Sequence, residues 1–212
     1  MMNGIRSALI DAVVAALPVA IVFFSGWAYL SSYLGEFGVD ATEVTVPLST
    51  VLVYAFIPLA SAWVLIFLAV CLIGALLVAY SGKGGTNSEK VGPFVLSTSL
   101  VALVSFLFIV KGVAAGEART MATFVWTGDK AQSVPVVITP HPPGPYADFE
   151  QCRDRRGLRQ IIGFPDRMYV LCRDTDLPCI QGRMFVVSTA GAIIYSALKN
   201  RGFKEGDKNC EK

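Results

Sequence analysis

The sequence carries little charge for its length. Only 16% of its 212 residues are Asp, Glu, Lys or Arg, whereas 54% are hydrophobic, and the mean hydropathy is +0.57. A soluble globular domain normally carries about 25% charged residues. This balance excludes an intrinsically disordered chain, a collagen-like chain and a purely cytosolic enzyme.

Residue patterns that carry common chemistry are also missing. His141 is the only histidine and lies within a proline-rich stretch, so the usual zinc sites with paired histidines are excluded. No two cysteines form a Cys-x-x-Cys pair, and the Gly-Lys-Gly-Gly run at 82–85 lacks the strand and the Lys-Ser/Thr ending of a phosphate-binding loop. We therefore expect no catalytic residue, no metal site, no cofactor and no enzymatic activity.

The few charges are unevenly distributed along the chain. Four Lys/Arg and five Asp/Glu precede Ala114, and the remainder of the chain holds 14 Lys/Arg and 11 Asp/Glu. Three stretches carry no charge at all: 24 residues at 12–35, 39 at 44–82 and 20 at 91–110. Each reaches the roughly 20 apolar residues that a helix needs to cross a bilayer.

These stretches predict a transmembrane domain over residues 1–114, followed by a soluble domain over 115–212. The middle stretch is too long for one upright span and too short for two spans with a turn, so we expect one long, tilted or projecting helix. A cleaved signal peptide is the alternative for the first stretch, but its apolar run is far longer than a signal sequence requires. We therefore expect three transmembrane helices, at about 8–34, 48–80 and 92–113.

The soluble half contains short runs of β-branched and aromatic residues between turn-forming residues. A proline-rich connector at 140–145 interrupts them, because a proline cluster cannot enter a sheet. Residues 189–200 fit a closing strand or a short helix, and the cap residue Ser188 and the stop residue Gly202 favour the helix slightly. The pattern predicts a small β-rich domain with strands at 124–126, 134–138, 158–162, 168–172 and 182–187.

Four of the five cysteines, Cys152, Cys172, Cys179 and Cys210, lie in the soluble half. An even number of cysteines in a domain of about this size is typical of a disulfide framework in an oxidising compartment. Three connectivities are possible. The short spacing between Cys172 and Cys179 favours their pairing, which leaves Cys152 for Cys210.

Aromatic residues gather at the end of the first apolar stretch. Trp27, Tyr29, Tyr33 and Phe37 fit an interfacial aromatic belt, or alternatively a packing motif. The pattern Gly-Trp-x-Tyr-Leu followed by Tyr-Leu-x-x-Phe-Gly resembles a segment of small uncharacterised bacterial inner-membrane proteins, over residues 26–58 at most. The resemblance implies a bacterial inner-membrane location and brings no assigned activity.

Orientation follows mainly from the cysteines, because Lys/Arg near the helix ends divide three against two between the two sides. We expect the N-terminus in the cytoplasm and the disulfide-stapled domain in the periplasm. Basic residues in that domain form either a solvated face or a contact for anionic headgroups or a partner; they are Arg153, Arg155, Arg156 and Arg159.

Two functional hypotheses follow. The first is a non-enzymatic integral membrane subunit that anchors and oligomerises a small extracytoplasmic β domain for docking to a partner protein. The second is a membrane effector or channel-like subunit, for instance in bacterial defence, in which the β domain senses a ligand. The expected partners are the lipid bilayer and further copies of the chain or a larger membrane complex, and no nucleic acid is expected.

Overall fold

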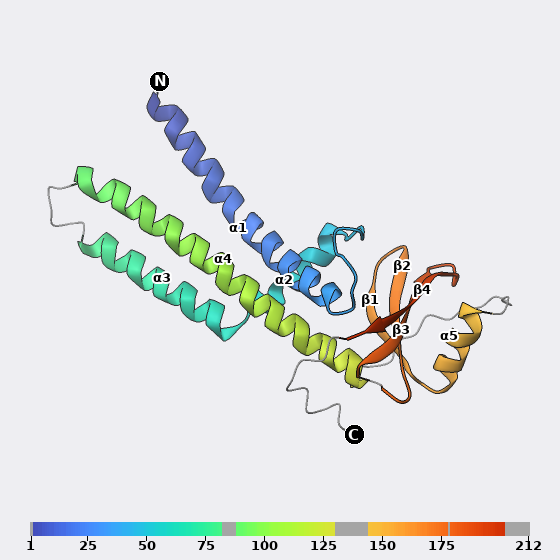
Figure 1. The fold of residues 1–212 in the computed structure, drawn as a ribbon. Helices are drawn as coiled ribbons and strands as arrows, with labels where there is room; N and C mark the ends of the chain where they lie inside the picture. Colours follow the sequence, from blue (N-terminus) through green and yellow to red (C-terminus); the bar gives the residue numbers. More distant parts are fainter. Residues whose placement is uncertain (1, 82–87, 130–143, 178, 202–212) are drawn as a thin grey trace. The chain divides into compact units, whose positions relative to one another are not determined.

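The computed structural model describes residues 2–81, 88–129, 144–177 and 179–201. Five helices and four strands are found within these residues (Figure 1). The helices are α1 (Met2–Gly35), α2 (Leu48–Leu59), α3 (Ala62–Ser81), α4 (Ser88–Thr127) and α5 (Pro145–Asp154). The strands are β1 (Leu158–Gly163), β2 (Arg167–Arg173), β3 (Gln181–Ser188) and β4 (Ile193–Asn200).

The chain divides into two compact units, each assembled from two segments. The helical unit comprises Met1–Ser32 and Leu48–Ala118, and the sheet unit comprises Tyr33–Pro47 and Arg119–Lys212. The last turn of α1 and the last part of α4 therefore belong to the sheet unit. The sequence predicted a border near residue 114, but it did not indicate that Tyr33–Pro47 joins the later segment.

Among the described residues, two helical stretches, Ala15–Gly35 and Ser97–Thr127, are long and apolar enough to cross a membrane. A third span exists among these residues only if α2 and α3 are counted as one, and these two helices are bent by 77°. The expected single helix at 48–80 is therefore wrong. Pro58 lacks the N–H of a helical residue and disturbs the preceding turn, and the Ser61 hydroxyl accepts the Val64 N–H at 3.4 Å where α3 begins.

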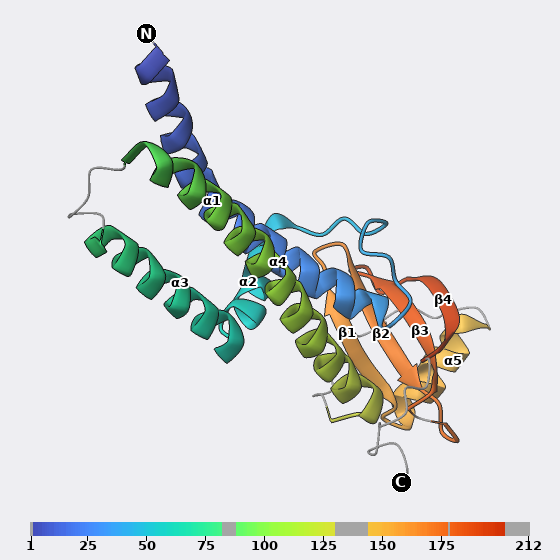
Figure 2. The ribbon, with the colours of Figure 1, turned by 60° about the vertical axis from the view of Figure 1, so that its left-hand side comes forward.

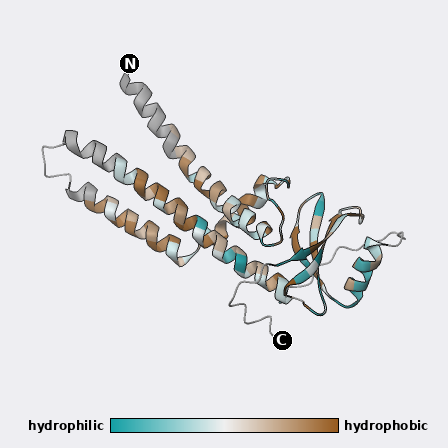
Figure 3. Ribbon diagram, viewed as in Figure 1, coloured by the Kyte–Doolittle hydropathy of each residue, from teal (hydrophilic) through white to brown (hydrophobic). Residues whose placement is uncertain are grey.

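The surface of the helical unit is strongly apolar, as the brown colouring of α3 and of much of α4 shows (Figure 3). Large hydrophobic side chains along these two helices are exposed, which fits surroundings of lipid or of other membrane helices. They include Trp63, Leu65, Ile66, Val70, Leu72, Ile73, Leu76, Leu100, Val101 and Phe108.

Helices α1 and α2 approach each other closely within the helical unit. A Cβ atom added at Gly26 would lie 1.9 Å from the Val51 carbonyl oxygen, so only glycine allows this crossing. Nearby, the buried Ser25 hydroxyl donates a hydrogen bond to the Ala55 carbonyl at 3.3 Å. The rings of Tyr29 and Tyr54 stack with their centroids 5.5 Å apart.

The four strands form one antiparallel sheet in the order β1-β2-β3-β4 (Figure 2). The predicted strands at 158–162, 168–172 and 182–187 are confirmed, and the first two form the expected hairpin. The slightly favoured helix over 189–200 is wrong, because Ile193–Asn200 pairs with β3 as a strand. Pairing with β3 satisfies the backbone hydrogen bonds of this segment, whereas a short isolated helix is unfavourable to nucleate.

Two further differences concern the start of the soluble half. Residues 124–126 were expected to form a strand, but they lie in α4, which extends to Thr127 rather than ending near 113. Helix α5 was not predicted, although Pro145 at its first turn is a favoured helix-starting residue. The expected strand at 134–138 and most of the connector at 140–145 lie outside the described residues.

Candidate docking surface

Helix α5 covers one face of the sheet. Phe149 of α5 packs edge-on against Phe185 of β3, with ring centroids 5.4 Å apart, in a cluster that also contains Val170. Asp148 of α5 forms an ion pair with Arg183 on the same face of β3. Successive residues of a strand point to opposite faces, so every second residue of β2 and β3 lies on the face that α5 covers.

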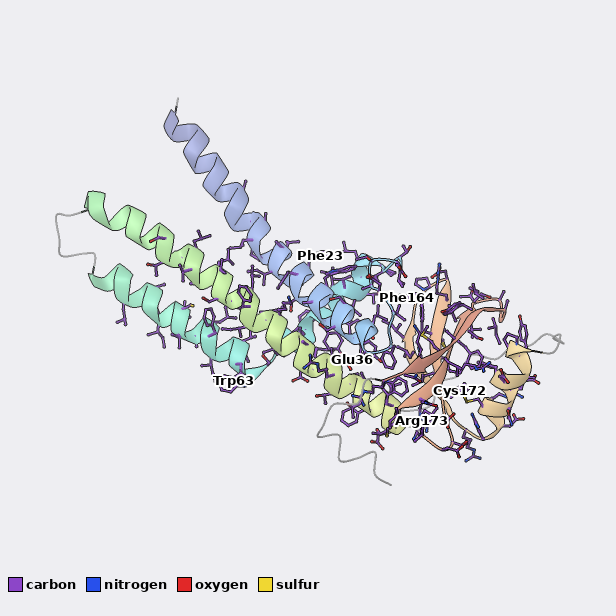
Figure 4. The ribbon with its side chains drawn as sticks, viewed as in Figure 1. Phe23, Glu36, Trp63, Phe164, Cys172 and Arg173 are labelled. Carbon is purple, nitrogen blue, oxygen red and sulfur yellow. A yellow bond between two sulfur atoms is a disulfide. The ribbon has the colours of Figure 1, made fainter. Side chains whose placement is uncertain are left out.

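A disulfide joins α5 to this face of the sheet. Cys152 of α5 bonds to Cys172 of β2, with a Cα–Cα distance of 6.0 Å (Figure 4). The expected Cys172–Cys179 and Cys152–Cys210 pairings are therefore both wrong. The physical reason is strand alternation, which turns Cys172 and Val170 toward α5, whose buried side presents Cys152. Cys179 is also disulfide-bonded, and Cys210 lies outside the described residues.

The turn after β2 has its own local support. The Asp174 carboxylate accepts the backbone N–H groups of Asp176 at 2.8 Å and Leu177 at 3.2 Å. These hydrogen bonds lower the pKa of Asp174 because they favour its charged form. The turn closes on itself before Cys179 is reached, without a disulfide across it.

The opposite face of the sheet is covered by the helix ends that belong to the sheet unit. The Tyr33 hydroxyl donates a hydrogen bond to the Ile161 carbonyl at 2.9 Å. Phe37 stacks on Trp126 with ring centroids 5.9 Å apart. A Cβ atom at Gly182 of β3 would lie 3.3 Å from the Trp126 ring, so a small residue is needed where the tryptophan lies on the strand.

These contacts place most of the predicted aromatic group in the protein core. Tyr29, Tyr33 and Phe37 are only 1–2% exposed, which matches the packing alternative rather than a belt of lipid-facing rings. Trp27 is half-buried and stacks on Phe23, with ring centroids 6.3 Å apart. Trp27 is therefore the member of the group that still fits an interfacial position.

The predicted arginine group does not form one common patch. Arg159 turns inward, where its guanidinium donates to the carbonyls of Gly128 at 3.1 Å, Arg156 at 2.9 Å and Leu158 at 2.8 Å. Gly128 follows the end of α4 with a φ of 87°, a conformation typical of the glycine that ends a helix. Arg159 places a positive charge at this helix C-terminus, where the helix dipole favours it.

The other three predicted arginines occupy different surroundings. Arg155 lies over the disulfide, with Nη2 3.3 Å from the Cys172 sulfur. Arg153 is paired with Asp154 at 3.2 Å on the surface. Arg156 is exposed, and its side chain makes no hydrogen bond or ion pair within the described part of the chain. A contact with anionic headgroups or a partner stays a prediction for Arg153, Arg155, Arg156 and Arg159.

Sequence reasoning missed Arg173, which lies beside Arg159 at the end of α4. A Cβ atom added at Gly128 would lie 1.8 Å from the Arg173 Nη1 atom, so the guanidinium fills the space that glycine leaves. Burial and the neighbouring charge of Arg159 lower the pKa of Arg173, and Asp129 opposes this shift. No local signal marks Arg173, because its partners are brought together by the fold.

The outer strand β4 carries the most exposed apolar side chains of the sheet. Ile194 is 59% exposed, Tyr195 51% and Leu198 72%, and we name these three residues the β4 edge. No charged residue occurs at positions 193–198. The Lys199 ammonium, at the end of the strand, donates a hydrogen bond to the Gly38 carbonyl at 2.9 Å.

The other outer strand, β1, is better protected. Its register shifts between Gln160 and Ile162, as that of β4 does between Ile193 and Tyr195, so a bulge does not distinguish the two outer strands. The Ile161 carbonyl already accepts the Tyr33 hydroxyl, and both Ile161 and Ile162 are buried. The β4 edge is therefore the better candidate for docking another protein.

The helical unit has one further apolar feature, a groove between α3 and α4 with a volume of about 540 Å³. Its size and apolar lining fit a hydrocarbon chain more readily than a polar ligand. Groups of His, Cys, Asp or Glu able to hold a metal ion are not found among the described residues. The groove is lined by Trp63, Ile66, Phe67, Val70, Ile109, Gly112 and Val113.

Comparisons of this chain with protein-family models, with curated proteins and with solved structures find no match.

Proposed function

We propose that the protein is a non-enzymatic integral membrane subunit that anchors a small extracytoplasmic β unit and presents it for docking to a protein partner. The observation that carries the proposal is the β4 edge, with three exposed apolar side chains on an outer strand whose residues 193–198 carry no charge. Exposed edges of this kind recruit further strands, and natural proteins usually protect them with charge or proline.

The construction of the sheet unit supports an anchoring role. Its core includes Tyr33 near the end of the first apolar stretch, Phe37 just beyond it, and Trp126 at the end of α4. The sheet therefore packs on residues at the ends of two candidate membrane spans. This continuity of the chain supports a sheet unit that is attached to the membrane.

The disulfide supports a location outside the cytoplasm. Disulfides persist in oxidising compartments and are rare in the cytosol, and the apolar helices fit insertion into a membrane. We propose the bacterial inner membrane with a periplasmic sheet unit and a cytoplasmic N-terminus. Homo-oligomers or a larger membrane complex are the proposed assemblies.

Site-specific photo-crosslinking in intact membranes tests the docking role. A photoreactive amino acid at Leu198 of the full chain should give one discrete crosslinked adduct. The matched control is the same amino acid at Asp154, which is exposed at the end of α5. Equal and diffuse labelling from both positions would contradict the proposal.

A second candidate function is a membrane effector or channel-like subunit, whose β unit senses a ligand. The 77° bend between α2 and α3 favours it, because broken helices at membrane depth often line cavities. Ion flux through liposomes that contain the purified chain would support this function. A discrete crosslink at Leu198 without ion flux through the liposomes would favour the anchored subunit.

A further inference from the structure

We propose that the partner of the β4 edge is a second copy of this chain, with the two β4 strands paired antiparallel about a two-fold axis at Ser196. The inference rests on the proposed docking function and names its partner. The resulting assembly is a continuous sheet shared by two copies.

The first argument is the position of β4 as an outer strand of the described sheet. The strand is eight residues long and pairs with β3, and the sheet order of the described residues ends at β4. Ile194 falls in the register shift between its neighbours Ile193 and Tyr195, so it has no partner residue in β3. An outer strand of this length offers a row of backbone N–H and C=O groups to another strand.

The second argument is the register of a symmetric pair. Residues that face each other across an antiparallel pair point to the same side of the sheet, so a two-fold axis normal to the sheet must pass through a residue pair. An axis at Ser196 places Ile194 of each copy opposite Leu198 of the other. Both side chains are more than half exposed in the single chain. The symmetric pair would contain two Ile194–Leu198 contacts, one on each side of the axis, and each contact would cover both side chains.

Neighbouring registers give poorer matches. An axis at Ala197 places Tyr195 opposite Lys199 and Leu198 opposite Ser196, whereas an axis at Tyr195 leaves Leu198 without an opposing strand residue. Apolar cross-strand pairs contribute to sheet stability, and the Ser196 register alone matches the two exposed aliphatic side chains.

The third argument is charge. Residues 193–198 carry no charge, so two identical edges approach without like-charge repulsion. The Lys199 ammonium is turned toward the Gly38 carbonyl in the same chain. A C2 pair requires a self-complementary surface, and anchoring in one membrane gives the two copies a high effective concentration.

Cysteine crosslinking of the full chain in membranes tests the register. Opposed residues of an antiparallel pair have Cα atoms about 4.5–5.5 Å apart, which suits a disulfide. In a Cys71→Ser background, Ser196→Cys should give a covalent dimer that a reductant dissolves. The matched control is Thr189→Cys, exposed in the turn between β3 and β4, which should give roughly tenfold less dimer.

A second variant tests the apolar pairing. Leu198→Lys in the Ser196→Cys chain should reduce the covalent dimer about tenfold, because a charge would face Ile194 of the other copy. Retention of the Cys152–Cys172 peptide in non-reducing mapping shows that each variant still folds. Equal dimer from Ser196→Cys and Thr189→Cys would overturn the pairing.

The photo-crosslink at Leu198 separates this inference from the docking function. An adduct of twice the mass of the chain supports both. A discrete adduct with a different protein overturns self-pairing and leaves the docking function standing. Failure to form any discrete adduct overturns both.

Discussion

Gly26 allows α1 and α2 to meet backbone to backbone. Since an added Cβ atom would lie 1.9 Å from the Val51 carbonyl oxygen, Gly26→Ala should force the helices apart and cost about 1–3 kcal/mol of stability. Thermal unfolding of the purified chain in detergent measures the effect. Gly74→Ala is the matched control, because nothing lies within 4 Å of its added Cβ atom; equal effects of the two substitutions would contradict the close crossing.

The Tyr33 hydroxyl fastens the end of α1 to β1. Tyr33→Phe removes the donor to the buried Ile161 carbonyl and should cost about 1–3 kcal/mol, because the carbonyl loses a partner away from water. Chemical unfolding of the sheet unit within the full chain, followed by tryptophan fluorescence, measures it. Tyr195→Phe at a half-exposed ring is the control and should change stability little.

Sequence alone could mark Tyr33 as unusual but could not find its partner. The aromatic group at the end of the first apolar stretch is visible by spacing, whereas Ile161 lies 128 residues later in the chain. Arg159 gives the same lesson, because its inward hydrogen bonds depend on where α4 ends. A residue's type and neighbours predict that it matters, and only the fold decides whether it faces lipid, solvent or protein.

Among the elements, the link between α5 and β2 carries the clearest prediction. Removing it with Cys152→Ser and Cys172→Ser together should lower the stability of the sheet unit by about 3 kcal/mol, the chain-entropy expectation for a link across 20 residues. The unfolding midpoint under non-reducing conditions measures this change.

Peptide mapping without reductant checks the connectivity itself. We expect a Cys152–Cys172 peptide, and cysteine counting predicts Cys210 as the partner of Cys179. A Cys172–Cys179 peptide would contradict the structure. Four free thiols would also remove the argument for an oxidising compartment.

Local patterns predicted the elements that are locally determined. The hairpin of β1 and β2 was found from its turn residues and β-branched runs. Residues 124–126 have the same composition but continue α4, since an established helix extends at lower cost than a new strand can form without a neighbour. The prediction of a helix over 189–200 was wrong for the complementary reason. The residues of β4 form a strand because they pair with β3, and the composition of 189–200 alone does not reveal that pairing.

For the whole molecule, membrane orientation is the decisive prediction. A reporter that is active only outside the cytoplasm should be active when fused after Lys212, and one that is active only inside should work at the N-terminus. The cysteines support this orientation, because the described disulfide needs an oxidising side. Cytoplasmic activity at Lys212 would contradict it.

The two-segment construction of the sheet unit has a consequence for biosynthesis. Tyr33–Pro47 leaves the ribosome before the 71 residues of Leu48–Ala118, and only then do its packing partners such as Trp126 follow. At about 5–20 residues per second this delay is roughly 4–14 s. During this time Phe37 and its neighbours lack their packing partners. The sheet unit can therefore complete its folding only after α4 has been synthesised.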